Sequence, residues 1–198
     1  MGNCQPFAIM RLTHEAIRSG LKEIKELISD KYVDVEKLKA TFNDIKRVIQ
    51  LHASQEEAVF YVELSKKKKG VTSHFTSEHE EEKLAFETID DLMNDVNSDE
   101  TQYLLIDLLN SWVDNHLEHL IHEEEGLMNL LPELFTYVES VQVVRLIIEY
   151  DLEEFEHFQL KWVYDRLNSK QKEVYLGMLK GCSPANKFED FLAKLTIE

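Results

Sequence analysis

The apolar residues of this chain recur every three or four positions through long stretches, the spacing that forms one buried face of an α-helix. Glycine and proline, which interrupt helices, number only six and three in 198 residues. The spacing predicts four long helices, over residues 7–29, 34–67, 72–96 and 99–131. Because short polar segments join them, we predict an all-α fold built on an antiparallel up-down four-helix bundle.

Local signals define the ends of these helices. Ser98 or Asp99 is a suitable N-cap for the fourth helix, and Pro132 and Phe135 mark its end near Leu131. In the third helix, the apolar residues expected in the core are Leu84, Phe86, Ile89, Leu92 and Met93.

The C-terminal part of the chain keeps a helical pattern in shorter segments. We expect helices over residues 141–150, 152–167 and 170–179, and a last one that begins at Ser183-Pro184. No stretch rich in glycine and serine separates this part from the rest. We therefore divide the chain into a four-helix bundle with a two-metal site, residues 1–135, and a helical extension packed on it, residues 136–198.

The charge and the cysteines narrow the range of partners and compartments. A formal net charge of −16 disfavours binding to nucleic acids or to anionic lipid. No segment has the roughly 18 consecutive apolar residues of a membrane span, and two distant cysteines, Cys4 and Cys182, suit a reducing compartment. The start, MGNC, offers Gly2 and Cys4 for lipidation, but Pro6 stands where the acylation pattern requires Ser or Thr. We expect an unlipidated protein of the cytoplasm or nucleus.

Two of the predicted helices carry the same polar pattern on an apolar face. His52 is followed by Glu56, and His119 by Glu123, and residues four apart lie on the same side of a helix. Burial disfavours a charged carboxylate. Two such carboxylates facing each other inside a bundle would also repel, unless a cation lay between them.

The other two helices each offer one further histidine, His14 and His79, so that four histidines and two glutamates can converge. Such a set can hold two metal ions bridged by the carboxylates, as four-helix bundles with inward-pointing ligands do. Mixed imidazole and carboxylate ligands suit iron better than metals that prefer thiolates, although zinc or manganese also accepts them.

The four segments that carry these residues resemble the haemerythrin-like family. They are THEAIR (13–18), HASQEEAVF (52–60), SEHEEE (77–82) and HLIHEEEGL (119–127). The likeness extends along almost the whole chain to the haemerythrin-like modules of plant iron-sensing ubiquitin ligases. The resemblance implies that two Fe ions, with an oxo, hydroxo or water bridge, are bound by His14, His52, His79 and His119 and bridged by Glu56 and Glu123.

The chain also departs from parts of this resemblance. Oxygen-carrying haemerythrins have a second histidine where this chain has Lys83, so the resemblance is to four-histidine relatives with coordination positions open to O2, peroxide, nitric oxide or water. No RING, F-box or zinc-finger pattern is present, so ligase activity is not implied.

The remaining histidines and two neighbouring glutamates receive ordinary interpretations. We expect His116, His122 and His157 at the surface or as hydrogen-bonded core residues, with His122 also placed to orient a ligand. His74 matches the family signature less well than His79. Glu57 and Glu124, next to the proposed bridges, are expected to be solvated.

Three functions remain open at this point. The first is an iron- and oxygen-binding protein that acts in iron and oxygen sensing or in storage. The second is a di-iron oxidase or oxygenase that reduces O2 or peroxide, for which no catalytic residue is assigned. The third is a metal-free helical protein whose C-terminal helices bind a protein partner.

Overall fold

The computed structural model describes residues 6–154 and 157–195, and these residues form helices with no strand among them. The prediction of an all-α protein is confirmed. Gly2 and Cys4 lie outside the described residues. The four long segments consist of α1 (Ala8–Ile28), of α2 (Val35–Gln55) continued by a π-helix η1 (Glu56–Phe60) and α3 (Tyr61–Lys67), of α4 (Ser73–Asn94) and of α5 (Asp99–Gly126).

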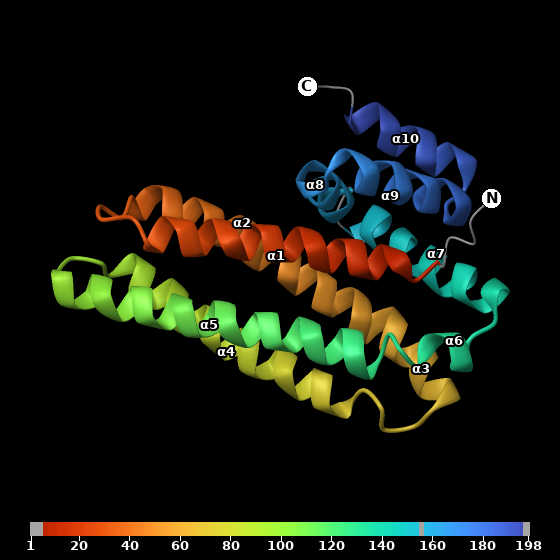
Figure 1. The fold of residues 1–198 in the computed structure, drawn as a ribbon, viewed down its shortest axis with the longest axis horizontal. Coiled ribbons are helices and arrows are strands. Elements are labelled where there is room, and N and C mark those ends of the chain that lie inside the picture. The colour runs from red at the N-terminus through yellow and green to blue at the C-terminus, as the bar shows by residue number, and fades with distance from the viewer. Residues whose placement is uncertain (1–5, 155–156, 196–198) are drawn as a thin grey trace.

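The long helices pack in pairs around a shared interior (Figure 1). Helix α1 lies against α2 and α5, and α4 lies against α5 and α2. The second long segment is continuous but changes its winding, because α2 passes directly into η1 and then into α3. Phe42, Phe86 and Trp112, from three different helices, form a cluster in which the Phe42 and Trp112 rings are 5.3 Å apart.

Capping residues fix where two of these helices begin. The Asp34 carboxylate accepts a hydrogen bond from the Lys37 backbone N–H at the start of α2. Ser98 and Thr101 form a reciprocal capping box at the start of α5, so Ser98 is the N-cap.

Two expectations about these helices are wrong. Leu84 is 64% exposed rather than in the core, because it is two residues from Phe86 and therefore lies on the opposite side of α4. Helix α5 ends at Gly126 rather than near Leu131. Pro132 lies in the first turn of a short helix, α6 (Leu131–Leu134), where proline is tolerated because no intrahelical N–H is needed there.

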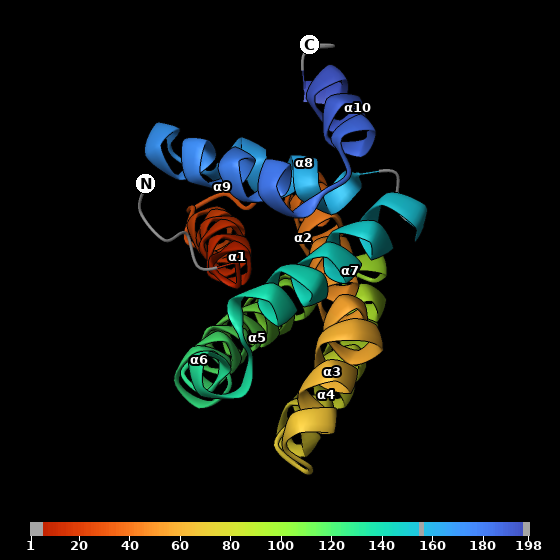
Figure 2. The same cartoon turned by 90° about the vertical axis from the view of Figure 1, so that its right-hand side faces the viewer.

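The C-terminal helices cover one side of α1 and α2. They are α7 (Tyr137–Glu154), α8 (Phe158–Arg166), α9 (Ser169–Cys182) and α10 (Ala185–Leu195). Helices α7 and α8 contact α2, α8 and α9 contact α1, and α7 also contacts η1 (Figure 2). Gly20 permits this packing, because a Cβ atom there would lie 3.0 Å from Ile45 and 3.1 Å from Trp162 of α8.

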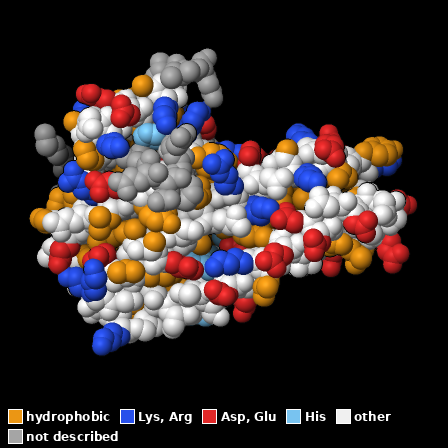
Figure 3. Space-filling view, turned by 180° about the vertical axis from the view of Figure 1, so that it is seen from behind, with side chains coloured by type: hydrophobic (Ala, Val, Ile, Leu, Met, Phe, Trp, Pro, Cys, Tyr) orange, Lys and Arg blue, Asp and Glu red, His pale blue; other side chains and the backbone are white. Residues whose placement is uncertain are grey.

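The surface is consistent with the acidic composition. On the face shown in Figure 3, Lys and Arg side chains are dispersed among Asp and Glu side chains rather than forming one large basic area. Within the described part of the chain, no helix is both long enough and apolar enough to cross a membrane.

Candidate metal centre

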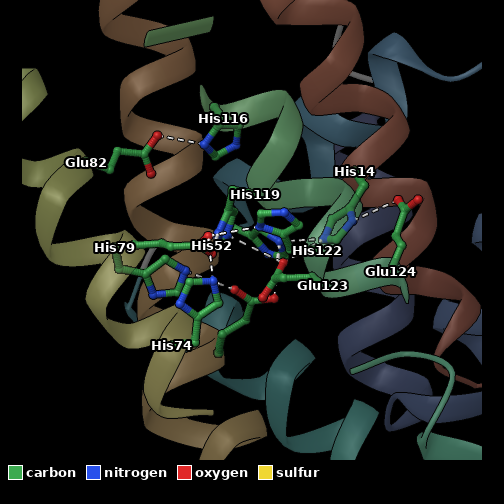
Figure 4. Close-up of polar contacts among 12 residues, drawn as sticks. His14, His52, His74, His79, Glu82, His116, His119, His122, Glu123 and Glu124 are labelled. Carbon is green, nitrogen blue, oxygen red and sulfur yellow. Dashed lines mark hydrogen bonds and ion pairs between the residues drawn. The ribbon is translucent and has the colours of Figure 1, made fainter. Parts of the chain in front are cut away.

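The structure brings the six predicted residues together between the long helices. Figure 4 labels five of them: His14, His52, His79, His119 and Glu123. His14 comes from α1, His52 from α2, Glu56 from η1, His79 from α4, and His119 and Glu123 from α5, and all six are buried. Their donor atoms form two groups, each within 4.8 Å: His14, His52, Glu56 and Glu123; and His79, His119, Glu56 and Glu123. The two glutamates belong to both groups, so they lie between the two pairs of histidines.

The Nε2 atoms of the histidines face one another and the two carboxylates. His14 Nε2 lies 3.0 Å from His52 Nε2 and 3.5 Å from Glu123 Oε2. On the other side, His79 Nε2 is 3.6 Å from Glu56 Oε2, and His119 Nε2 is 3.6 Å from Glu123 Oε2.

Carboxylates outside the cluster orient three of the four imidazoles. The Nδ1 atom is 3.0 Å from Glu124 in His14, 2.9 Å from Glu57 in His79, and 2.7 Å from Glu78 in His119. A neutral imidazole that donates from Nδ1 to a carboxylate keeps its Nε2 lone pair free. The hydrogen bonds therefore point three lone pairs into the cluster, in the form that binds metals.

Glu57 and Glu124 do not behave as the solvated charges that the sequence suggested. Glu124 also accepts a hydrogen bond from Arg18 at 2.9 Å. Although partial burial raises the pKa of Glu124, the hydrogen bonds from His14 and Arg18 lower it to about 2. Both carboxylates therefore hold imidazoles in place, and Glu124 remains charged at neutral pH.

The buried carboxylates provide a test of whether a cation fits here. Both oxygens of Glu56 and Oε2 of Glu123 are buried without a hydrogen-bond partner among the described residues. Burial, and then the charge of Glu123, raise the pKa of Glu56 well above its ordinary value. Burial, and then the charge of His14, lower the pKa of His52, so this imidazole is neutral. Imidazole nitrogens around carboxylate oxygens that lack hydrogen-bond donors are a set of ligands that a metal cation satisfies.

Tyr61 is a site residue that the sequence did not reveal. Its hydroxyl donates to Glu123 Oε1 at 2.6 Å, and its ring stacks on the His79 ring with centroids 5.9 Å apart. The π-helix explains this position, because the Tyr61 N–H bonds to the Glu56 carbonyl five residues earlier. Tyr61 therefore lies about one turn after Glu56 on the same side of the helix. In a regular α-helix, residues five apart would point in different directions.

The other histidines occupy three kinds of position. His116 is buried, and its Nδ1 is 2.6 Å from Glu82, which also accepts from Trp112. Its Nε2 is buried without a hydrogen-bond partner among the described residues, so it is a core residue that is only half satisfied. His157 is buried with a left-handed backbone just before α8. His74 and His122 lie near the surface, beside Glu78.

A small cavity of about 30 Å³ adjoins the cluster on the side of the C-terminal helices. Three of its polar lining residues, His52, Gln55 and Glu56, come from α2 and η1. Its apolar lining residues are Ile9, Met10, Ile147, Ile148 and Leu160. This volume is about that of a single water or diatomic molecule.

An all-helical protein with four imidazoles and two carboxylates buried between its long helices is of the class that holds cations in its interior. The chain matches the Hemerythrin HHE cation binding domain over residues 5–131, and it belongs to that family. It is also 22% identical over 189 residues to the zinc finger protein BRUTUS of Arabidopsis thaliana. This alignment covers 92% of the present chain and 15% of the relative. The chain thus spans about 15% of the length of that relative. It has no match among solved structures.

These findings confirm the family resemblance. The family binds cations, and the two buried clusters fit a metal site.

Proposed function

We propose that this chain is a haemerythrin-like di-iron protein, in which His14 and His52 bind one ion and His79 and His119 the other. Glu56 and Glu123 would bridge the ions. The observation that carries the proposal is that these two carboxylates belong to both donor groups while three of their four oxygens are buried without a hydrogen-bond partner among the described residues.

The long segments, in this proposal, form the up-down four-helix bundle of the family within residues 1–135, and residues 136–198 are an extension that closes one side. The ligands favour iron because they combine imidazole and carboxylate and include no thiolate. Lys83 is exposed and pairs with Glu80 at 3.8 Å, so no fifth histidine or substitute contributes from this position.

The small cavity supports a gaseous or similarly small ligand, such as O2. Its walls are mainly apolar, it adjoins His52 and Glu56, and its volume of about 30 Å³ suits a diatomic molecule. Two ferrous ions, held by the four histidines and the two glutamates, would supply reducing chemistry toward such a ligand. The residues of the chain hold the imidazoles in one tautomer, keep bulk water out, and provide one O–H group, that of Tyr61, at the Glu123 carboxylate.

A role in iron and oxygen sensing or in storage follows from the link between metal and folding. Without a cation, the buried Glu56 must be protonated or repel Glu123, whereas an ion that binds only the folded chain stabilises it. Iron occupancy would therefore change how tightly α2 and α5 are held together.

The test measures iron content and thermal unfolding of the same preparation. We expect two Fe per chain and a Tm that falls after iron is removed with a chelator and recovers when Fe²⁺ is returned. Glu56→Gln should lose the two-iron stoichiometry, whereas Glu81→Gln, an exposed carboxylate on α4, should keep it. Coincident unfolding curves with and without iron would contradict the sensing role, and absence of bound metal would favour a metal-free interaction protein.

A di-iron oxidase is the second candidate, and the Tyr61 hydroxyl favours it. Burial and the carboxylates of Glu56 and Glu123 raise the pKa of Tyr61, so the phenol keeps a proton beside the site. Oxygen consumption distinguishes the two: repeated turnover in the presence of a reductant supports an oxidase, and a single stoichiometric uptake supports a binding protein.

A further inference from the structure

A third group of metal-ligating side chains lies at the surface of α4 and α5, outside the six residues of the centre. It consists of His74, Glu78 and His122. His74 and Glu78 repeat the His-x-x-x-Glu spacing within α4, and His122 comes from α5. We propose that these three residues bind one divalent transition-metal ion, of the class of Zn²⁺ or Fe²⁺, at a site separate from the buried centre.

The distances between the donor atoms suit a single ion. His74 Nε2 lies 3.2 Å and His122 Nδ1 lies 3.1 Å from the same oxygen, Glu78 Oε1. Ligands that bind a metal at about 2.0–2.1 Å, with angles between 90° and 109°, are about 2.9–3.4 Å apart. Both distances fall in this range, so an ion can take all three donors with small side-chain movements.

The exposure of the three residues also suits a surface site. His74 is 69% exposed and His122 41%, whereas Glu78 is 21% exposed, so the carboxylate is fixed at the base and the imidazoles can close over an ion. The remaining coordination positions of the ion would face solvent and hold water, as in metal sites that exchange ligands.

The surroundings attract cations. A pocket of about 260 Å³ is lined by two of the three residues, Glu78 and His122. Three further carboxylates line it, those of Glu81, Glu82 and Glu118. The described residues that line it include no lysine or arginine. A hollow lined by charges of one sign concentrates ions of the opposite sign. The inner wall of the same pocket is formed by His116 and His119.

Glu78 connects the surface group to the buried one. Its Oε1 faces His74 and His122, while its Oε2 accepts from His119 Nδ1 at 2.7 Å. The surface site and an innermost histidine of the centre therefore share one carboxylate. The surface site depends only on its own three ligands, and it stands whether or not the centre holds iron.

The experiment compares zinc binding by the full-length protein and by variants, all with the metal content of the centre measured beforehand. Isothermal titration with Zn²⁺ in a non-coordinating buffer should show one more ion bound by the wild type than by the double variant His74→Ala/His122→Ala. Each single variant should bind this ion at least about tenfold more weakly, since each removes one of three ligands.

Two controls keep the result interpretable. Glu81→Gln removes a charge from the same pocket but no ligand, so it should weaken binding by less than about threefold. Because His74 and His122 are exposed, the double variant should unfold at the Tm of the wild type. Imidazole ¹H–¹⁵N spectra should show His74 and His122 shifting with Zn²⁺ while the distant His157 does not.

Equal zinc stoichiometry and affinity in the wild type and the double variant would overturn the proposal, leaving Glu78 as a hydrogen-bond acceptor only. The outcome is distinguishable from failure of the proposed function. If the centre binds no iron, the iron content is low in every chain, but the difference in zinc binding between wild type and double variant remains.

Discussion

The hydroxyl of Tyr61 and the carboxylate of Glu123 are joined by a 2.6 Å hydrogen bond that links the second and fourth long segments inside the protein. The bond depends on the π-helix Glu56–Phe60, which turns Tyr61 toward the interior. A single change in helical winding thus supplies a buried O–H donor to a carboxylate that two groups of histidines share.

Replacing this tyrosine tests how much the bond contributes. Tyr61→Phe should lower the free energy of unfolding by about 1–3 kcal/mol, because Glu123 Oε1 loses its donor while remaining buried. Urea denaturation of the metal-free protein measures this change. Tyr103→Phe, at a residue that is exposed on α5, should leave stability unchanged. An unchanged stability in Tyr61→Phe would show that the bond contributes nothing.

The carboxylates behind the histidines should control metal affinity without being ligands. Glu124→Gln removes the charge that holds His14 Nδ1, and we expect metal affinity to fall about 10–100-fold. Glu125→Gln is a matched control, since it removes the same charge from the next residue, which is exposed. Competition with a chelator of known affinity measures both, and equal affinities in the two variants would refute the positioning role.

Asp151 should make stability depend on pH. Burial raises the pKa of this carboxyl to about 6, although nearby backbone N–H groups of Leu160 and Gln159 and the charge of Lys194 lower it. The folded state therefore binds its proton more tightly than the unfolded state, and the associated stability is present below pH 4 and is lost as pH rises to about 6. Over this window the loss is about 3 kcal/mol, at about 1.4 kcal/mol per pKa unit.

The variant Asp151→Asn isolates this effect, because the amide does not ionise there. The difference in unfolding free energy between Asp151→Asn and the wild type should grow in favour of the variant between pH 4 and pH 7. Urea denaturation across this range provides the measurement. A difference that stays constant with pH would show that Asp151 has an ordinary pKa.

The contact between α1 and α8 can be tested with two glycines. Gly20→Ala should lower stability, because the added Cβ would lie 3.0–3.1 Å from Ile45 and Trp162. Gly177→Ala in α9 should raise stability by about 0.5–1 kcal/mol, since nothing lies within 4 Å and alanine favours the helix. Thermal unfolding compares the two variants. Equal stabilisation of both would mean that α8 moves away at little cost to accommodate the added methyl group.

The sequence allowed the helices and the buried cluster to be predicted because both follow from regular spacing. Residues four apart share a helix face, so the side chains of each pair point into the same space. The pairs are His52 with Glu56 and His119 with Glu123. Tyr61 could not be found in this way, since a π-helix breaks the 3.6-residue period on which the prediction rests. Its stacking on His79 depends on another helix.

Other parts of the site depended on contacts between helices. His74 and Glu78 show the same spacing as the buried pairs, but His122 completes the group from α5. Likewise, nothing local distinguishes Glu124 from Glu125. Only the packing of α1 against α5 places the first beside His14 and Arg18 and leaves the second in solvent.

The two sides of the centre differ in character, because the extension formed by α7, α8 and α9 lines only one of them. Toward His52 and Glu56 the pocket is lined mainly by apolar surface, whereas toward His119 it is lined by four carboxylates. If the centre holds a cation and a small neutral ligand as proposed, an apolar pocket would adjoin it on one side and an acidic pocket on the other, so the two ligands would not compete for one entrance.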